Sequence, residues 1–469
     1  MSKLVMKFGG TSVDGGPKIR KVARLVSEQG KGHQVVVVCS AMGNVTDELA
    51  GLSAAAAKEM DKAVDDRLSA IRKRHMAALD GAVKRDAVRK KVRGSIEGTL
   101  TQLEKVARGI TVLGELTPRS RDVMLSCGER LSNPIVQGAL LERGLDATYL
   151  TGGEAGIMTD DRFGDAVPLL EVTRFQVKEN LVPLLNGGKT PVVTGYIGQT
   201  QGGEITTMGR GGSDLTATVI AAAIDADEVW IWSDVDGLMT ADPRIVPRAK
   251  VLREISYSEA GEMAVFGAKA LHPRTLEPVA EKGIPVRFRN TFNPKDTGTV
   301  VKKDPTLYSG KIVKAVALVK DVAIITVAGA SMVGKPGSAA RIFDVVAKSG
   351  VNVLMISQSV SESNISLLVS RPSLAKGANA LELALLGQGG FRKVQTEDDV
   401  NAIAIVGGGM RGIKGIAAAA FGAIAAKGIN VRMIAQGSSE QNISLAVGDE
   451  DGKEAVRAVH AAFHLDRLG

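Results

Sequence analysis

The residues best suited to chemistry stand at the start of the chain, in the stretch KFGGTS. Lys7 precedes Gly9 and Gly10 at the end of an apolar run, Leu4 to Phe8, whose pattern predicts a buried strand. The two glycines allow the backbone to approach a ligand closely, and their N–H groups can bind an anion. The lysine adds a point charge that suits phosphate. The stretch predicts a phosphate-binding loop, and the alternative is a flexible turn beside an exposed lysine.

Nearby hydroxyls and a second glycine-rich stretch point the same way. Thr11 and Ser12 are expected to cap the helix that follows the first loop. Residues 209–214, GRGGSD, are expected to open another helix. Glycines, a helix N-terminus and Arg210 together suit a carboxylate or a phosphate. A plain glycine-rich turn is the alternative for this stretch.

The elements that must position these residues follow from the hydrophobic pattern. Further strands are expected at residues 35–39, 191–194, 228–232 and 285–288, and helices at residues 52–108. Strands that alternate with helices form a parallel sheet with right-handed crossovers, and ligands then bind beyond the carboxyl ends of the strands. The sequence therefore predicts an α/β fold whose polar loops gather at one edge of the sheet.

Composition and charge limit the possible functions. The 469 residues are 44% hydrophobic and 23% charged, so the chain can bury more than one core. The net charge of +8 is spread along the chain and aromatic residues make up only 3%, so the sequence does not support nucleic-acid binding. Cys39 and Cys127 are too few for a disulfide scaffold or a cysteine metal site. Neither a signal peptide nor a membrane-spanning stretch is expected, which indicates a cytoplasmic protein.

The last third of the chain contains an internal duplication. Gly329 corresponds to Gly407 and Phe343 to Phe421, 78 positions later in each case. A long match of this kind without a gap indicates that one segment was copied. The glycine-lysine pattern of the first copy is similar to a P-loop, but Pro336 stands where a magnesium-binding hydroxyl is needed, so we do not assign one.

Each copy predicts a small β-α-β-β-α-β module, the ferredoxin-like arrangement. Its strands are expected at residues 322–327 and 365–369 in the first copy, and at residues 402–406 and 443–447 in the second. Two interpretations are open: a duplicated scaffold for dimerisation, and a pair of small-ligand sites where the glycine loop meets a strand ending in glutamine. We favour sites formed between paired modules, because these satisfy both interpretations.

Taken as a set, the motifs resemble those of the aspartate kinases, members of the amino acid kinase family with two C-terminal ACT domains. The motifs are KFGGTS, SAM with Thr46, SCGER, GRGGSD, SDVDG with DPR, FGAKALHPRT and the duplicated segments, which cover nearly the whole chain in the family's order. The resemblance implies an open, mainly parallel sheet flanked by helices, followed by two ferredoxin-like modules. The implied domains are a catalytic domain at residues 1–303 and ACT domains at residues 312–398 and 399–469, with completion of the first ACT domain by the last segment as an alternative.

The resemblance further implies ATP-dependent phosphorylation of the side-chain carboxylate of L-aspartate, with Mg²⁺ as the metal cofactor. The product, 4-phospho-L-aspartate, is the first intermediate toward lysine, threonine and methionine. Feedback inhibition by threonine or lysine is expected through the ACT pair, in a homodimer or a higher homo-oligomer. Neither nucleic acid nor a membrane is an expected partner.

The resemblance also implies roles for individual residues. Lys7 and Asp214 are the expected catalytic residues, and Asp214 would orient the lysine. The residues expected to bind aspartate are Ser40, Thr46, Glu129, Arg210 and Ser213. Those expected to bind the nucleotide are Lys7, Gly9, Gly10, Ser233, Asp234, Arg244 and Lys269. Those expected to bind the effector are Asn352, Gln358, Asn364, Asn430, Gln436 and Asn442, and no residue is assigned to the metal.

Two departures from the family pattern and three alternatives stay open. Asp236 and Met239 differ from residues that the family often has there, which leaves stacking on the nucleotide base open. A kinase of another acidic amino acid or derivative is the nearest alternative. A non-catalytic amino-acid sensor would not need Lys7 or Arg210, and a redox protein would need an intact dinucleotide fingerprint in the first domain.

Overall fold

The computed structural model describes residues 1–265, 273–306, 311–329, 332–386 and 391–468. The chain divides into two compact units. Unit 1 comprises Met1–Leu238, Arg253–Tyr257 and Ala270–Pro305, and unit 2 comprises Met239–Leu252, Ser258–Lys269 and Thr306–Gly469.

Unit 1 is built on an eight-stranded sheet with the strand order β3-β4-β2-β1-β7-β9-β10-β8. Its strands are β1 (Ser2–Phe8), β2 (His33–Cys39), β3 (Ala147–Leu150), β4 (Thr190–Thr194), β7 (Glu228–Ser233), β8 (Glu254–Ser256), β9 (Val286–Asn290) and β10 (Thr299–Lys302). All neighbouring strands are parallel except β9 and β10. β1 and β2 are buried over five consecutive residues each, because both their faces are covered.

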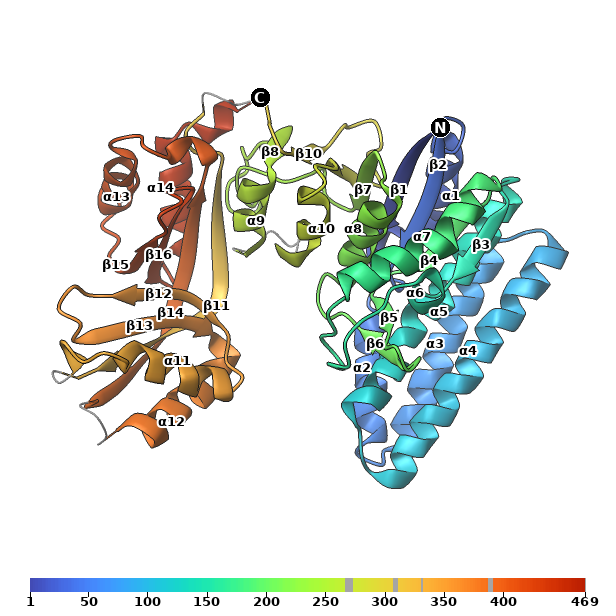
Figure 1. The fold of residues 1–469 in the computed structure, drawn as a ribbon, viewed down its shortest axis with the longest axis horizontal. Helices are drawn as coiled ribbons and strands as arrows, with labels where there is room; N and C mark the ends of the chain where they lie inside the picture. Colours follow the sequence, from blue (N-terminus) through green and yellow to red (C-terminus); the bar gives the residue numbers. More distant parts are fainter. Residues whose placement is uncertain (266–272, 307–310, 330–331, 387–390, 469) are drawn as a thin grey trace. The chain divides into compact units, whose positions relative to one another are not determined.

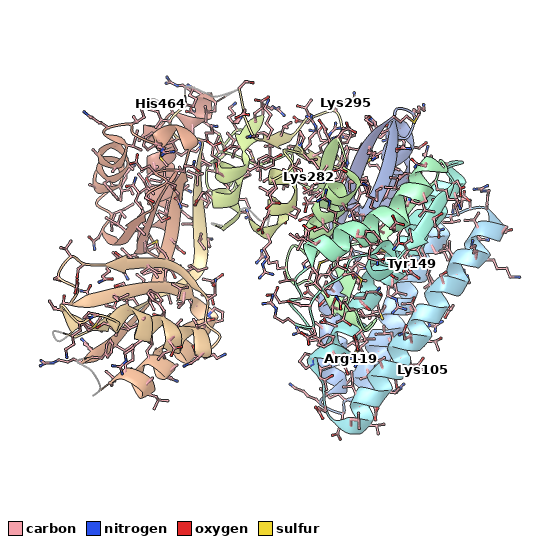
Figure 2. The ribbon with its side chains drawn as sticks, in the orientation of Figure 1. Lys105, Arg119, Tyr149, Lys282, Lys295 and His464 are labelled. Carbon is pink, nitrogen blue, oxygen red and sulfur yellow. The ribbon has the colours of Figure 1, made fainter. Side chains whose placement is uncertain are left out.

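Helices flank this sheet (Figure 1). They are α1 (Gly16–Gln29), α2 (Val45–Ala56), α3 (Asp61–Ala82), α4 (Asp86–Leu113), α5 (Pro118–Glu142), α6 (Gly152–Ala155), α7 (Leu170–Asn186), α8 (Gly212–Ile224) and α10 (Glu277–Ala280), and a small hairpin is formed by β5 (Ile197–Gln199) and β6 (Ile205–Thr207). The long helices α3, α4 and α5 pack against one another, and Lys105 and Arg119 extend from them into solvent (Figure 2). None of the described helices is long and apolar enough to cross a membrane.

Unit 2 contains a six-stranded sheet with the strand order β12-β13-β11-β14-β16-β15. Its elements are α9 (Tyr257–Val265, from Ser258 onward), β11 (Ala315–Ala328), α11 (Ser338–Lys348), β12 (Val353–Gln358), β13 (Asn364–Ser370), α12 (Leu374–Leu385), β14 (Lys393–Val406), α13 (Ile416–Ala425), β15 (Val431–Gln436), β16 (Asn442–Gly448) and α14 (Gly452–Ala462). Val322 pairs with Ser370, and Val400 pairs with Gly448 in the same register 78 positions later. The predicted fold class, a mainly parallel α/β sheet with two ferredoxin-like modules, is confirmed.

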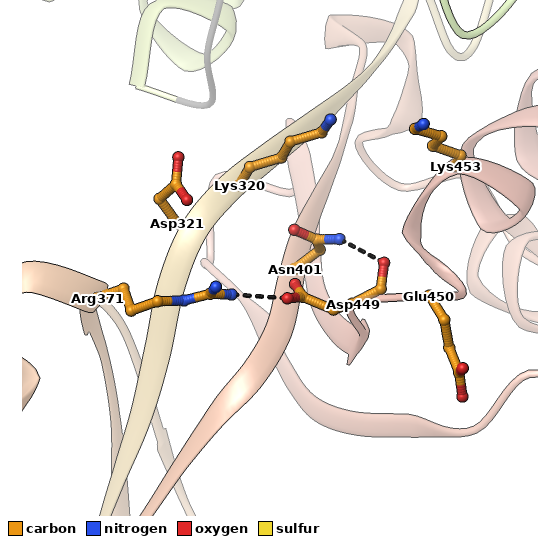
Figure 3. A pocket seen from close by; sticks show the side chains of 7 residues that line it. All are labelled: Lys320, Asp321, Arg371, Asn401, Asp449, Glu450 and Lys453. Atoms are coloured by element: carbon orange, nitrogen blue, oxygen red, sulfur yellow. Dashed lines mark hydrogen bonds and ion pairs between the residues drawn. The ribbon is translucent and has the colours of Figure 1, made fainter.

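The two modules of unit 2 share their central strands. The first half of β11 pairs with the second half of β14, and the second half of β11 pairs with the first half of β14. Arg371 and Asp449, which are equivalent positions in the two copies, form an ion pair at 2.8 Å (Figure 3). A cavity of about 350 Å³ beside this pair is lined by further charged residues, among them Lys320 and Asp321. The duplication therefore folds as one continuous sheet.

The predicted helix cap after the first glycine loop is wrong. α1 begins at Gly16, after Gly15, whose φ of 99° lies in the left-handed region that favours glycine. Ser12 is buried and shares a 2.7 Å hydrogen bond with the hydroxyl of Thr291 in the loop after β9. The hydroxyl that we assigned to a cap therefore connects two loops at the edge of the sheet.

Candidate active site

Lys7 and Asp214 meet at the carboxyl edge of the sheet in unit 1. Lys7 lies next to the last residue of β1 and is 8% exposed, and Asp214 lies in the first turn of α8. The Lys7 ammonium group forms an ion pair with Oδ1 of Asp214. The ammonium nitrogen also lies 3.7 Å from the position that a Cβ atom at Gly9 would occupy. The structure thus brings the predicted catalytic pair together and places its positive charge beside the glycine loop.

The loops that follow β1, β2 and β7 are joined by backbone hydrogen bonds. The N–H of Gly9 donates to the carbonyl of Trp232 at 3.0 Å, and the N–H of Gly43 donates to the carbonyl of Gly10 at 3.0 Å. A Cβ atom at Gly10 would lie 2.9 Å from the carbonyl oxygen of Ala41, so no side chain fits there. Glycine at position 10 therefore allows the first two loops to pack directly on each other.

Glu129 lies on α5, against the loop after β2. Its side chain is 2% exposed, and Oε1 accepts a 3.0 Å hydrogen bond from the N–H of Ala41. Oε2 is also buried and makes no hydrogen bond to another described residue. Burial raises the pKa of Glu129 to about 8, although the Ala41 N–H and the charge of Lys7 act in the opposite direction. A buried carboxylate oxygen without a partner suits a cationic ligand group.

The loop before α8 contains a guanidinium group, that of Arg210. Gly209 and Gly211 have φ values of 66° and 79°, in the left-handed region that favours glycine, and α8 begins directly after them. Arg210 is exposed and makes no hydrogen bond or ion pair with the rest of the described chain. Ser213 is half-buried, and its Oγ lies 2.6 Å from the position that a Cβ atom at Gly195 would occupy. A helix N-terminus with a free arginine can bind a carboxylate.

Ser40 and Thr46 flank the loop after β2, and both are half-buried. The carbonyl of Ser40 accepts a 2.9 Å hydrogen bond from the hydroxyl of Ser132, and Asn133 donates to the carbonyl that ends β2 at 3.2 Å. Ser132 and Asn133 were not predicted from the sequence. Their spacing of three and four residues from Glu129 puts all three on one face of α5, which was the available signal.

Ser233 ends β7, the strand next to β1, and Asp234 follows it. The side chain of Asn290 donates to the carbonyl of Asp234 at 3.3 Å and to Oδ1 of Asp236 at 2.9 Å. The carboxylate of Asp234 is exposed and has no hydrogen bond or ion pair to another residue that the structure describes. Asn290 thus holds the end of β7 in place and leaves one carboxylate free.

Of the other two residues expected to bind the nucleotide, one belongs to the described part of the chain. Arg244 belongs to unit 2, where its guanidinium pairs with Oδ2 of Asp242 at 2.6 Å and with Oδ1 at 3.0 Å. Lys269 lies outside the described residues.

The first module of unit 2 contains a cavity of about 340 Å³ at the N-terminus of α11. Gln358, at the end of β12, lines it together with Lys335 and Glu362. Glu362 accepts a 2.8 Å hydrogen bond from the N–H of Gly334 in the glycine loop. Side chains of both charges therefore line one small cavity, as recognition of a free amino acid requires.

The first module contains two more predicted effector residues. Asn352 and Asn364 are not among the described residues that line this cavity. Asn352 precedes β12 and Gln358 ends it, and six residues of strand span about 20 Å. One amino acid cannot contact both side chains. Asn430 and Gln436 stand at the two ends of β15 in the same way.

In the second module Asn442, which is equivalent to Asn364 of the first module, already has a partner. Asn442 donates a 2.9 Å hydrogen bond to Glu262 of α9. Glu259 on the same helix is 1% exposed, pairs with Lys314 at 2.9 Å and accepts a 2.6 Å hydrogen bond from the N–H of Gly408. The carboxylates of Glu259 and Glu262 therefore already accept hydrogen bonds from donor groups of the second module.

Glu362 and its equivalent Glu440 were not predicted. Each accepts a hydrogen bond from a glycine-loop N–H, that of Gly334 or Gly412, and they have φ values of 52° and 53°. The signal was present in the sequence, since the two glutamates stand 78 positions apart.

Comparisons with known proteins cover both units. The amino acid kinase family model matches residues 2–290, and an ACT domain model matches residues 325–385 and 403–463. Aspartokinase 2, chloroplastic, of Arabidopsis thaliana is 34% identical over 469 residues, which is 98% of this chain and 84% of that protein. The chloroplastic bifunctional aspartokinase/homoserine dehydrogenase of Daucus carota is 34% identical over 473 residues, and the chain spans about half (51%) of its length.

Solved structures of similar fold also match nearly the whole chain. E. coli aspartokinase III in complex with aspartate and ADP has a TM-score of 0.84 and 30% identity, over 98% of this chain and 99% of that chain. The same protein in complex with lysine and aspartate has a TM-score of 0.78 over the same shares. Because the sequence relatives and the structures cover the glycine loop, the Lys7–Asp214 pair and both modules, the chain belongs to the aspartokinases, within the amino acid kinase family.

Proposed function

We propose that this chain transfers the γ-phosphoryl group of ATP to the side-chain carboxylate of L-aspartate, giving 4-phospho-L-aspartate. The observation that carries the proposal is the buried Lys7 ammonium beside Gly9, at the same edge of the sheet as the unpartnered oxygen of Glu129. A phosphate group and the ammonium group of an amino acid would each find a partner there. The solved relative that binds aspartate and ADP supports both ligands.

Both reactants are anions, so the site has to neutralise charge and align the attacking oxygen with the γ-phosphate. The aspartate carboxylate is ionised at neutral pH and is already a nucleophile, so no general base is needed. Its oxygen forms the new bond to phosphorus as the bond to the bridging oxygen of ADP breaks. Lys7 stabilises the charge that spreads over the transferring group, and the ion pair with Asp214 fixes the direction of the ammonium.

The remaining groups hold the substrate. We assign the α-carboxylate of aspartate to Arg210 and its ammonium group to Glu129, with Ser40, Thr46 and Ser213 completing the pocket. In this arrangement Arg210 binds the negatively charged end of the zwitterion. The Glu129 oxygen that has no partner among the described residues binds its positively charged end.

Gly9, Gly10, Ser233, Arg244 and Lys269 remain proposed contacts of the nucleotide. Mg²⁺ in kinases is held mainly by the phosphates and by one or two carboxylates. Within the described ranges no group of three or more His, Cys, Asp or Glu could hold a metal. The free carboxylate of Asp234 suits an ion that is brought by ATP, and such an ion would neutralise phosphate charge.

The substrate can be tested by measuring ADP release with MgATP and L-aspartate, L-glutamate or N-acetyl-L-glutamate. We expect turnover with aspartate to exceed that with the other two by at least about 100-fold, because a site that grips both charged ends misplaces a longer side chain. Faster turnover with glutamate or its derivative would favour the alternative kinase. Absence of turnover with all three would favour a sensor.

The raised pKa of Glu129 predicts a pH-dependent KM for aspartate. Below pH 8 its carboxyl group is largely protonated and neutral, whereas binding of an ammonium group needs the carboxylate. The KM for aspartate should therefore fall about tenfold as the pH rises from about 7 to about 9, measured at saturating ATP. Glu129→Gln should have a high KM that is flat over this range, and a persisting slope would assign the titration to another group.

We further propose that an amino acid, lysine or threonine, inhibits the enzyme by binding in the cavity of the first module. The support is a pocket of amino-acid size with Lys335, Glu362 and Gln358 on its walls. A relative of similar fold binds lysine. An effector can act on unit 1 only by favouring one of two arrangements, with a coupling of about 1–3 kcal/mol.

Gln358→Ala should weaken inhibition about tenfold, because it removes a hydrogen-bonding group from the cavity wall. The effector concentration for half inhibition can be measured at fixed aspartate and ATP with lysine and threonine in turn. Asn352→Ala, at the other end of β12, is the matched control and should keep the parent value. Equal effector concentrations for half inhibition in the parent and in Gln358→Ala would exclude this cavity as the effector site.

We also propose a homo-oligomer and a cytoplasmic location. The sheet of unit 2 ends in β12 and β15, and edge strands of this kind can pair with a second copy. Cys39 and Cys127 are free and buried, as expected in a reducing compartment. The domain limits 1–303, 312–398 and 399–469 likewise remain a proposal.

A further inference from the structure

Arg74 is a half-buried arginine on α3, outside the set of residues assigned to aspartate or ATP. Its Nη2 pairs with Oδ1 of Asp14 at 2.8 Å, and its Nη1 pairs with Oε1 of Glu48 at 2.6 Å. The three side chains are only 28–34% exposed. Asp14 stands in the loop after β1, and Glu48 stands in the first turn of α2. One guanidinium therefore spans two elements that follow neighbouring strands.

The same guanidinium also lies on the backbone of the loop after β2. A Cβ atom at Gly43 would collide with Nη2 of Arg74 and would lie 3.0 Å from Oδ1 of Asp14. Gly43 has a φ of 46°, and its N–H donates to the carbonyl of Gly10. The contact between the two loops and the arginine pairs thus form one connected cluster.

The charges in this cluster matter because the expected substrates are anions. Asp14 and Glu48 would repel a phosphate or a carboxylate nearby if they were unpaired. Lys18 also approaches Asp14, but at the longer distance of 3.7 Å. Arg74 can pair with both carboxylates at once because its guanidinium has a fixed fork of donors, which a lysine lacks.

We propose that Arg74 is a positioning residue for the phosphoryl transfer, which holds the loops after β1 and β2 in the arrangement that binds aspartate and phosphate. The inference rests on the proposed function, because these loops carry Gly9, Gly10 and Ser40. A shift of about 1 Å in such loops can cost about 100-fold in rate, so a residue that acts only through them can have a large effect.

The test compares Arg74→Gln with Arg72→Gln. Arg72 lies on the same helix and pairs with Glu97 on α4, so the control has the same change in charge and also loses an ion pair. We expect Arg74→Gln to raise the KM for aspartate about tenfold and to lower kcat about tenfold, while its thermal midpoint stays within a few degrees of that of the control. Arg74→Lys should show the same two changes at a smaller size, and it serves as the test if Arg74→Gln does not fold.

The results that would overturn the proposal differ from those that would overturn the proposed function. If the parent enzyme is active with aspartate and Arg74→Gln matches Arg72→Gln in both KM and kcat, Arg74 has no positioning role. A fall in kcat that only follows the unfolded fraction, with an unchanged KM, would make the role structural. A parent enzyme that is inactive with aspartate would contradict the proposed function and this role with it.

Discussion

Replacing Lys7 with alanine should lower kcat by a factor on the order of 10²–10³, with a smaller change in the KM for aspartate. The ammonium is nearly buried and is held by Asp214, so it acts at short range in a medium of low dielectric constant. Its charge is needed most when negative charge spreads over the transferring phosphoryl group. Steady-state ADP release at saturating aspartate and ATP measures the effect.

Lys3→Ala is the matched control for this prediction. Lys3 lies four residues earlier on the same face of β1, where its ammonium donates to the carbonyl of Ile224 at 2.7 Å. This variant should keep kcat within about twofold of the parent. A folded Lys7→Ala enzyme with nearly normal kcat would remove Lys7 from the catalytic site.

Replacing Glu129 with alanine should raise the KM for aspartate by a factor of about 10–100 and change the KM for ATP much less. The expected loss corresponds to one charge-assisted hydrogen bond to the substrate ammonium, worth about 1.5–3 kcal/mol. Both constants can be obtained by varying each substrate in turn at a saturating level of the other.

Two further variants locate this effect. Arg210→Ala should show the same pattern, because it would remove the partner of the substrate α-carboxylate. Glu142→Ala is the control, since Glu142 lies on the same helix α5 but accepts a hydrogen bond from the N–H of Arg85 at 2.8 Å. Equal increases in the KM values for aspartate and ATP in Glu129→Ala would mean that this residue does not distinguish the two substrates.

The central strands of unit 1 were predictable because they are apolar on both faces. The runs at residues 4–8 and 35–39 became β1 and β2, and the run at residues 228–232 became β7. The short strands β8 and β10 were not predicted. Each has only three or four residues, too few for a periodic pattern to stand out from a loop.

The duplication in unit 2 was predictable from its spacing, but the sharing of strands was not. A sequence repeat shows that two segments fold alike, whereas the pairing of β11 with β14 along their whole length depends on contacts between the copies. The wrong helix cap at Ser12 has a similar cause. Its partner, Thr291, lies far along the chain, and local capping rules do not include such partners.

For the candidate site, the sequence motifs placed Lys7, Asp214 and Glu129 in one region, but they could not show the environment of each group. The pKa of Glu129 depends on complete burial, which no motif reports. From α3, Arg74 pairs with Asp14 in the loop after β1 and with Glu48 in α2, and the sequence around Arg74 gives no signal of this role. Both the pKa of Glu129 and the contacts of Arg74 depend on packing between segments that lie far apart in the sequence.

Trapping the acyl phosphate product tests whether the phosphoryl group is transferred to the side-chain carboxylate of aspartate. The chain would be incubated with MgATP, L-aspartate and hydroxylamine, which attacks an acyl phosphate at its carbonyl carbon and releases inorganic phosphate. We predict one equivalent of the aspartate side-chain hydroxamate for each ADP formed, with neither product in the absence of aspartate. ADP release without hydroxamate, or a hydroxamate at the α-carboxylate, would contradict phosphoryl transfer to the side-chain carboxylate.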